Sequence, residues 1–251
     1  EQIESMKQRN DDADNILART GGLLMWGDRH PEGRVVTKDQ FEAITIDDMK
    51  KYHARVYQPG NLIIGITGDF EQQEMISKLE SAFSGWAKGE PVPDPTDTDH
   101  KFTPGLYYVE KDIPQGKFVV TSRGIKRDDP DAIPCLVMND ILGGGGFTSR
   151  LMKRIRSDEG LTYGVGSGFQ TRVYYPGTFG VRTFSKNKTV ALTAKMVYEE
   201  LDKIRNTPVT QEELDVSKKS FIDTFPRTFE SKVGTVNVFI DDEWTKRPAD
   251  Y

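Results

Sequence analysis

Apolar and polar positions follow their most regular pattern between residues 130 and 170 of this chain. Four apolar side chains recur there at helical spacing: Ile133, Leu136, Val137 and Ile141. Four consecutive glycines, residues 143–146, come directly after them. Because glycine has no side chain and disfavours a helix, we expect this loop to end the helix and to let another part of the backbone come very close.

A second helix is predicted directly after the glycines. Ser149 can cap its first turn, because a serine hydroxyl accepts hydrogen bonds from the free N–H groups at a helix start. One side of this helix is apolar, through Leu151, Met152 and Ile155. The basic side chains are expected to stay in solvent or to reach outward: Arg150, Lys153, Arg154 and Arg156. Gly160 should end the helix, and the alternation from Leu161 to Val165 predicts a strand.

The pattern is less regular in the first part of the chain. Residues 1–20 predict a polar helix that stops at the two glycines that follow. Thr45 and Asp48 have the spacing of a capping box, in which each side chain bonds the backbone N–H of the other residue, so a helix should begin there. The run LIIGITGD, residues 62–69, is almost continuously apolar and predicts a strand covered on at least one face.

The domain boundary is predicted from one segment of low apolar content. Residues 71–84 predict an amphipathic helix, and residues 89–100 then hold three prolines and four acidic side chains, which is typical of a solvated linker. We therefore expect the C-terminal part of a first domain at 1–88, a linker at 89–104 and a second domain at 105–251.

Within the second domain, the pattern predicts a sheet and further helices. The expected strands lie at 105–110, 117–123, 162–173 and 177–185. Residues 187–205 carry a clear helical stripe, and Thr210 with Glu213 has the spacing of a second capping box. No closing strand similar to residues 62–69 follows, so the second domain is expected to be truncated at its C-terminal end.

Composition narrows the class of protein. The 251 residues carry 34 basic and 39 acidic side chains, and this net charge of −5 gives no general affinity for nucleic acid. The hydrophobic content of 36% is enough for a real core, yet no stretch approaches the roughly 20 apolar residues of a transmembrane segment. The single cysteine, Cys135, lies in a helical stripe and cannot form an internal disulfide.

The three histidines do not have the spacing of a zinc site. His30 lies in a turn-rich segment, His53 lies in the middle of a predicted helix, and His100 lies in the linker. A zinc-binding helix needs two histidines about four residues apart, which none of these provides. We therefore expect no zinc site built from these histidines.

Arg156 and Tyr163 are the sharpest candidates for chemistry. An arginine on the last turn of a helix and a tyrosine two residues into the next strand can converge across a glycine turn and donate to one acceptor, such as a peptide carbonyl. The alternative is that Tyr163 is a core aromatic and Arg156 a solvated cation that complements the helix dipole. The pattern alone favours this alternative.

The motif ILGGGGFTSRLMKRIRSDEGLTYGV resembles the second-half signature of the pitrilysin/insulinase clan of zinc metallopeptidases, which includes the mitochondrial processing peptidases. The resemblance implies an α+β fold in which two homologous domains, each a mostly antiparallel sheet covered by helices, face each other like a clamshell. Both domains would be incomplete here. Arg156 and Tyr163 match the pair that holds the substrate backbone in that family, and Gly143, Gly144, Gly145 and Gly146 match its glycine-rich loop. This match reverses the preference for a structural role.

The resemblance also implies zinc, although most of its ligands would lie outside this chain. The family's HxxEH motif is absent from the 251 residues, so this chain alone should not hydrolyse peptides. Glu4 stands where the family's third metal ligand falls, shortly before an RNDD-like segment, and Glu1 is an equally polar alternative. An HxxEH motif upstream in a longer parent is the favoured arrangement.

The expected function is substrate-backbone binding within a zinc-dependent endopeptidase that cleaves unfolded peptides. The alternative is a non-catalytic peptide-binding or structural subunit of a two-subunit processing peptidase. The expected partners are a peptide or unfolded protein and a related subunit, as a homodimer or heterodimer. Neither nucleic acid nor a transmembrane segment is expected, and among compartments the bacterial periplasm is favoured.

Overall fold

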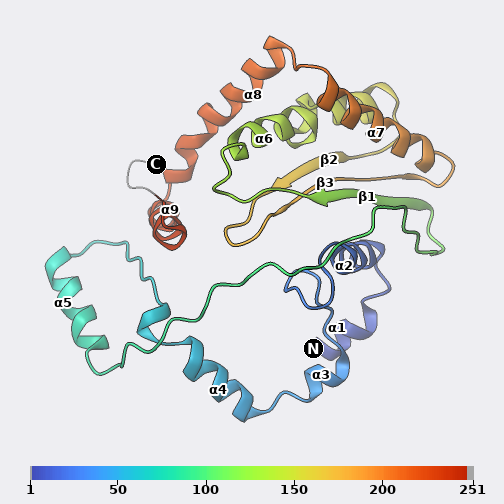
Figure 1. Ribbon diagram of the computed structural model, residues 1–251. Helices are drawn as coiled ribbons and strands as arrows, with labels where there is room; N and C mark the ends of the chain where they lie inside the picture. Colours follow the sequence, from blue (N-terminus) through green and yellow to red (C-terminus); the bar gives the residue numbers. More distant parts are fainter. Residues whose placement is uncertain (1, 248–251) are drawn as a thin grey trace. The chain divides into compact units, whose positions relative to one another are not determined.

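Figure 1 shows the computed structural model, which describes residues 2–247. The chain forms two compact units. The first, here called the sheet unit, consists of residues up to Phe41 together with Thr96–Lys219. The second, here called the helical unit, consists of Glu42–Pro95 and the residues from Ser220 on. The predicted domain limits stay a prediction, and each unit is described by itself.

The sheet unit is built on three antiparallel strands in the order β1-β3-β2. These are β1 (Gln115–Arg123), β2 (Val165–Gln170) and β3 (Thr178–Lys186). Three of the four predicted strands of this region are thereby confirmed. Residues 105–110 form no strand, and Leu106 is 97% exposed. This apolar segment does not pair with another strand among the described residues, so the prediction there was wrong.

One face of the sheet carries the core. Helices α6 (Ala132–Asn139) and α7 (Val190–Asn206) lie on this face, together with two π-helices, η2 (Asp140–Gly144) and η4 (Met152–Asp158) (Figure 1). The buried residues form one cluster: Leu142, Leu151, Ile155, Val165, Val181, Met196 and Val197. Successive side chains of a strand point to opposite faces of the sheet, which separates the core face from the outer face. Val181 is accordingly fully buried, while Arg182 beside it points to the other face.

Two helices at the start of the chain, α1 (Gln2–Gln8) and α2 (Ala13–Trp26), replace the single helix that was predicted. The predicted stop at Gly21 and Gly22 was wrong, because α2 continues through both glycines. A glycine costs a helix only about 1 kcal/mol, which burial of Met25 and Trp26 in the next turn can offset. The N-terminal end of α2 is tied to the outer face of the sheet, where Asp14 pairs with Lys117 and Arg182.

The linker predicted at 89–104 is anchored at its end rather than free in solvent. Asp97 pairs with Arg123 at 3.3 Å, and the Nε2 atom of His100 bonds the Leu24 carbonyl oxygen at 2.9 Å. Two of the four acidic side chains that suggested solvation pair with arginines, Asp97 with Arg123 and Asp99 with Arg29.

The helical unit holds α4 (Ile46–Val56), α5 (Gln72–Phe83) and α9 (Lys232–Thr245), with short 3₁₀ turns at Pro59–Asn61 and Phe225–Phe229. The capping box of Thr45 and Asp48 is confirmed. The strand predicted at 62–69 is not formed, because the described residues of this unit contain no other strand with which it can pair. Leu62, Ile63 and Ile64 are accordingly 39–49% exposed.

Two further helices complete the fold: α3 (Lys38–Glu42) and α8 (Gln211–Thr224). The predicted capping box at the start of α8 is confirmed, since the Thr210 N–H donates to Glu213 Oε2 at 2.8 Å and the Glu213 N–H to Thr210 Oγ1 at 3.2 Å. None of the helices between residues 2 and 247 has the length and apolar content needed to cross a membrane.

Candidate substrate-binding site

The glycine loop begins where α6 ends at Asn139 and the chain continues as the π-helix η2. A Cβ atom at Gly143 would lie 2.5 Å from the backbone nitrogen of Ser167 on β2, which is too close for any side chain. Gly146 has a φ of +64°, a conformation that favours glycine. The expected close backbone approach is therefore present, between this loop and the sheet.

A tight 3₁₀ turn, η3 (Gly146–Thr148), leads from the glycines into the next helix. The Thr148 hydroxyl donates to the Gly145 carbonyl at 2.9 Å, and the Ser149 hydroxyl to the Gly146 carbonyl at 2.7 Å. Ser149 therefore stands directly before the helix, as predicted, but its hydroxyl bonds back to the turn instead of capping the helix. These bonds fix a turn in which Phe147 is 70% exposed.

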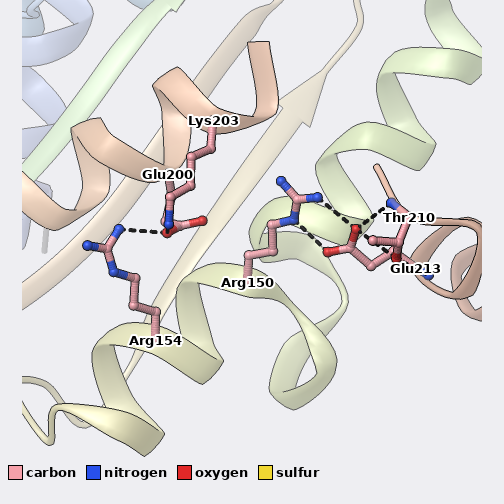
Figure 2. A network of polar contacts seen from close by, with 6 residues as sticks. All are labelled: Arg150, Arg154, Glu200, Lys203, Thr210 and Glu213. Carbon is pink, nitrogen blue, oxygen red and sulfur yellow. Dashed lines mark hydrogen bonds and ion pairs between the residues drawn. The ribbon is translucent and has the colours of Figure 1, made fainter. Parts of the chain in front are cut away.

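The helix after this turn covers residues 150–158 and includes η4, and it is held by its apolar side and by two of its arginines. Leu151 and Ile155 are fully buried, as the stripe predicted. Arg150 bonds Glu213 on α8, and Arg154 bonds Glu200 on α7 (Figure 2). Arg154 also bonds Glu199 on α7. Of the two alternatives expected for the basic side chains, these two arginines reach outward to neighbouring helices instead of staying in solvent.

Arg156 and Tyr163 come together at the end of this helix. The Arg156 guanidinium lies 5.0 Å from the centre of the Tyr163 ring and 4.6 Å from that of Phe147. Tyr163 is 79% exposed, so it is not a core aromatic. Among the described residues, no acceptor pairs with the guanidinium or with the Tyr163 hydroxyl. The geometry offers two kinds of hydrogen-bond donor on one exposed surface.

Residues 2–247 by themselves form no zinc site. Glu4 lies on α1, where its exposed carboxylate pairs with Lys7 at 2.9 Å, and Glu1 lies outside the described residues. No group of three or more His, Cys, Asp or Glu side chains between residues 2 and 247 is arranged to hold a metal ion. Whether Glu4 completes a site together with ligands from outside this chain stays a prediction.

His30 belongs to a buried cluster that the sequence analysis did not anticipate. Its ring is fully buried, stacked on Trp26 at 4.3 Å and edge-on to Tyr175 at 4.5 Å. Nδ1 accepts the Glu32 N–H at 3.1 Å, and Glu32 also accepts from the Tyr175 hydroxyl. Burial lowers the pKa of His30 below its usual 6.5, so the ring is neutral and structural. In the sequence, Trp26 lies four positions before His30, and this aromatic neighbour could have indicated that the histidine ring is buried.

Comparison with protein families matches residues 43–221 to the model described as the peptidase M16 inactive domain. Among curated proteins, the non-peptidase homolog YmxG of Helicobacter pylori is 32% identical over 208 residues, which cover 79% of this chain and 46% of that protein. An uncharacterized zinc protease of Mycobacterium leprae is 25% identical over 223 residues, covering 87% of this chain and 49% of that protein. The chain spans about half the length of the curated relatives it matches.

Solved structures share the fold. A peptidase M16 inactive domain from Pseudomonas fluorescens superposes with a TM-score of 0.87 at 24% identity, covering 98% of this chain and 58% of that one. A protease from Helicobacter pylori gives 0.78 at 19% identity, covering 98% and 60%. The predicted α+β class, with antiparallel sheet covered by helices, is confirmed.

Proposed function

We propose, from the premise that this chain belongs to the family of the peptidase M16 inactive domain, that it holds the substrate backbone within a zinc-dependent endopeptidase. The resemblance predicted from residues 139–169 is confirmed by the family match, which includes that segment. Several relatives carry the name zinc protease, which supports a peptidase-related role for the whole protein. Fold alone does not decide function, so the proposal rests on the site.

The observation that carries the proposal is the exposed pair of Arg156 and Tyr163. Both side chains can donate to a peptide carbonyl oxygen, and the planar guanidinium is the stronger donor because it is charged. The ring of Phe147 also lies close to the guanidinium, with 4.6 Å between the guanidinium and the ring centre. A carbonyl that reaches this position would receive a charge-assisted hydrogen bond from Arg156 and a neutral one from Tyr163.

The substrate class that fits this surface is an unfolded or extended peptide. A folded protein has most of its backbone carbonyls paired in helices and sheets, whereas an extended chain presents them to a partner. The described residues of this chain contain no metal group and its sequence no HxxEH, so they bind and orient the peptide and are not proposed to activate water.

The proposal is tested by Tyr163→Phe in the full-length protein, with fluorescein-labelled β-casein as an unfolded substrate. Loss of one hydrogen bond to a bound carbonyl should lower kcat/KM by roughly tenfold to a hundredfold. Tyr198→Phe is the matched control, because Tyr198 is an exposed tyrosine on α7. If both variants stay within about twofold of wild type and remain folded, the pair does not hold substrate.

A second function is favoured by one of the relatives. The 32% identical protein of Helicobacter pylori is named a non-peptidase homolog, so a non-catalytic subunit that binds peptides fits the same fold. Cleavage of the labelled casein that a chelator abolishes and added zinc restores would support the endopeptidase. Binding that persists without any cleavage, and that Tyr163→Phe weakens, would support the non-catalytic subunit.

A further inference from the structure

Arg150 and Glu213 make a two-pronged ion pair on the helix that carries Arg156. Nε of Arg150 donates to Oε1 of Glu213 at 2.6 Å, and Nη2 donates to Oε2 at 2.7 Å (Figure 2). Both carboxylate oxygens are used, and both side chains are more than two-thirds buried. A two-pronged ion pair of this kind fixes direction as well as distance.

Glu213 is itself held in place from the other side. Its Oε2 atom accepts the Thr210 N–H at 2.8 Å, and its own N–H donates to the Thr210 hydroxyl at 3.2 Å. Arg150 lowers the pKa of Glu213 to about 2, so the carboxylate is charged at any physiological pH. The start of α8 is therefore a rigid anchor for Arg150.

A second contact ties the same helix one turn further along. Nη1 of Arg154 donates to Oε1 of Glu200 at 2.6 Å, and Arg154 also bonds Glu199. Glu200 is only 5% exposed and pairs with a second cation, Lys203, at 2.9 Å (Figure 2). Two ion pairs thus hold the helix of residues 150–158, one to α8 through Arg150 and one to α7 through Arg154.

Apolar packing alone would leave this helix free to rotate about its own axis. Leu151 and Ile155 fill the core beneath it, but such contacts have little directional preference, so the helix can roll about its axis at small cost. A roll would swing Arg156 sideways, since its guanidinium lies in contact with Phe147 and Tyr163 outside the core. The two ion pairs oppose that roll.

We propose that Glu213 and Glu200 are positioning residues, which fix the rotation of η4 through Arg150 and Arg154 and so aim Arg156 at the substrate carbonyl. This inference rests on the proposed function of Arg156. Neither glutamate touches the peptide, and their effect passes through the orientation of the helix. A misplacement of about 1 Å at such a distance can cost on the order of a hundredfold in a reaction.

The test is the affinity of the full-length protein for fluorescein-labelled β-casein, measured by fluorescence anisotropy so that it does not depend on cleavage. Glu213→Gln keeps the side-chain size but replaces one acceptor oxygen by a donor, which breaks the two-pronged pair. We expect the Kd to rise about five- to tenfold. Glu32→Gln is the matched control, because Glu32 is a carboxylate of similar exposure that pairs with Arg172 and Tyr175 elsewhere in the sheet unit.

A double-mutant cycle distinguishes positioning from a general loss of stability. If Glu213 acts through Arg156, Glu213→Gln should have no further effect on Kd in a protein that already carries Arg156→Ala. A merely structural ion pair would weaken binding by the same factor in both backgrounds. Glu32→Gln should stay within about twofold in each.

The outcomes separate the two proposals. An equal effect of Glu213→Gln with and without Arg156, or a change below twofold in folded protein, would overturn the positioning role and leave the substrate role of Arg156 standing. An Arg156→Ala variant that binds casein as wild type does would overturn both. If thermal melting shows that Glu213→Gln is unfolded, Arg150→Lys replaces it, since lysine keeps the charge and loses the planar fork.

Discussion

Two arginines of the sheet unit lie over aromatic rings, Arg123 at 3.6 Å from the centre of the Trp26 ring and Arg156 at 4.6 Å from that of Phe147. The surroundings differ. Trp26 is 5% exposed and Phe147 is 70% exposed. Arg123 also pairs with Asp97, whereas no carboxylate pairs with Arg156 among residues 2–247.

The comparison shows that the enclosure of a cluster, more than its residue types, decides what it can do. Around Trp26, the donors of Arg123 and Tyr175 are taken up by Asp97 and Glu32. That cluster stabilises the fold, because leaving such groups without partners would cost free energy. Around Phe147 the same chemistry is open, so its donors remain for a ligand.

The largest expected effect is on stability. Trp26→Ala should lower the free energy of unfolding by about 3–5 kcal/mol, since it empties a buried site beneath His30 and Tyr175. Phe147→Ala should change it by less than about 0.5 kcal/mol. Urea titrations followed by circular dichroism measure both. Similar losses in the two variants would show that the clusters do not differ as described.

A smaller effect separates the two arginines. Arg123→Lys should lower the free energy of unfolding by about 1–2 kcal/mol, because lysine cannot stack flat on Trp26 and bond Asp97 at once. Arg156→Lys should leave the melting temperature unchanged and raise the Kd for labelled β-casein about tenfold. Thermal melts and anisotropy titrations of both variants give the comparison. It would be contradicted if Arg123→Lys weakened binding while Arg156→Lys weakened the fold.

The smallest effect is a dependence of stability on pH. The pKa of His30 is lowered by burial, an effect that Asp97 and Glu32 oppose and Arg123 reinforces. As the pH drops below about 6.5, His30 therefore binds a proton in the unfolded chain before it does so in the folded chain. The free energy of unfolding then falls by at most about 1.4 kcal/mol per pH unit. Unfolding curves between pH 7.5 and 5 measure the slope.

Two variants identify the source of that slope. His30→Asn removes the titrating ring while its amide oxygen can still accept the Glu32 N–H, and it should flatten the slope. His53→Asn, at an exposed position of α4, is the matched control for replacing a histidine by asparagine. An unchanged slope in His30→Asn would assign the pH dependence to other groups.

Local chemistry made part of this structure predictable from the sequence. Both capping boxes, at Thr45 and Thr210, and three strands of the sheet follow from residues close together in the chain. The convergence of Arg156 and Tyr163 followed from seven residues of spacing and a glycine turn.

What the sequence did not reveal depends on partners far along the chain. Residues 62–69 have the composition of a strand, but a strand needs a neighbour to pair with. Glu213 was recognised as a capping residue, while its second role depends on Arg150, which lies 63 positions earlier. For His30 the sequence raised only the question of zinc binding, because its burial depends on contact with Tyr175, far along the chain.

The single cysteine has a practical consequence for labelling this protein. Cys135 is a free, half-buried thiol on α6, and burial together with Asp131 and Asp129 raises the pKa of the thiol. Maleimide dyes react with the thiolate, so Cys135 should be modified slowly at neutral pH. A cysteine introduced as Ser157→Cys, at an exposed position next to Arg156, would take the dye first. A fluorophore can thus be placed beside the candidate site through Ser157→Cys while Cys135 is kept.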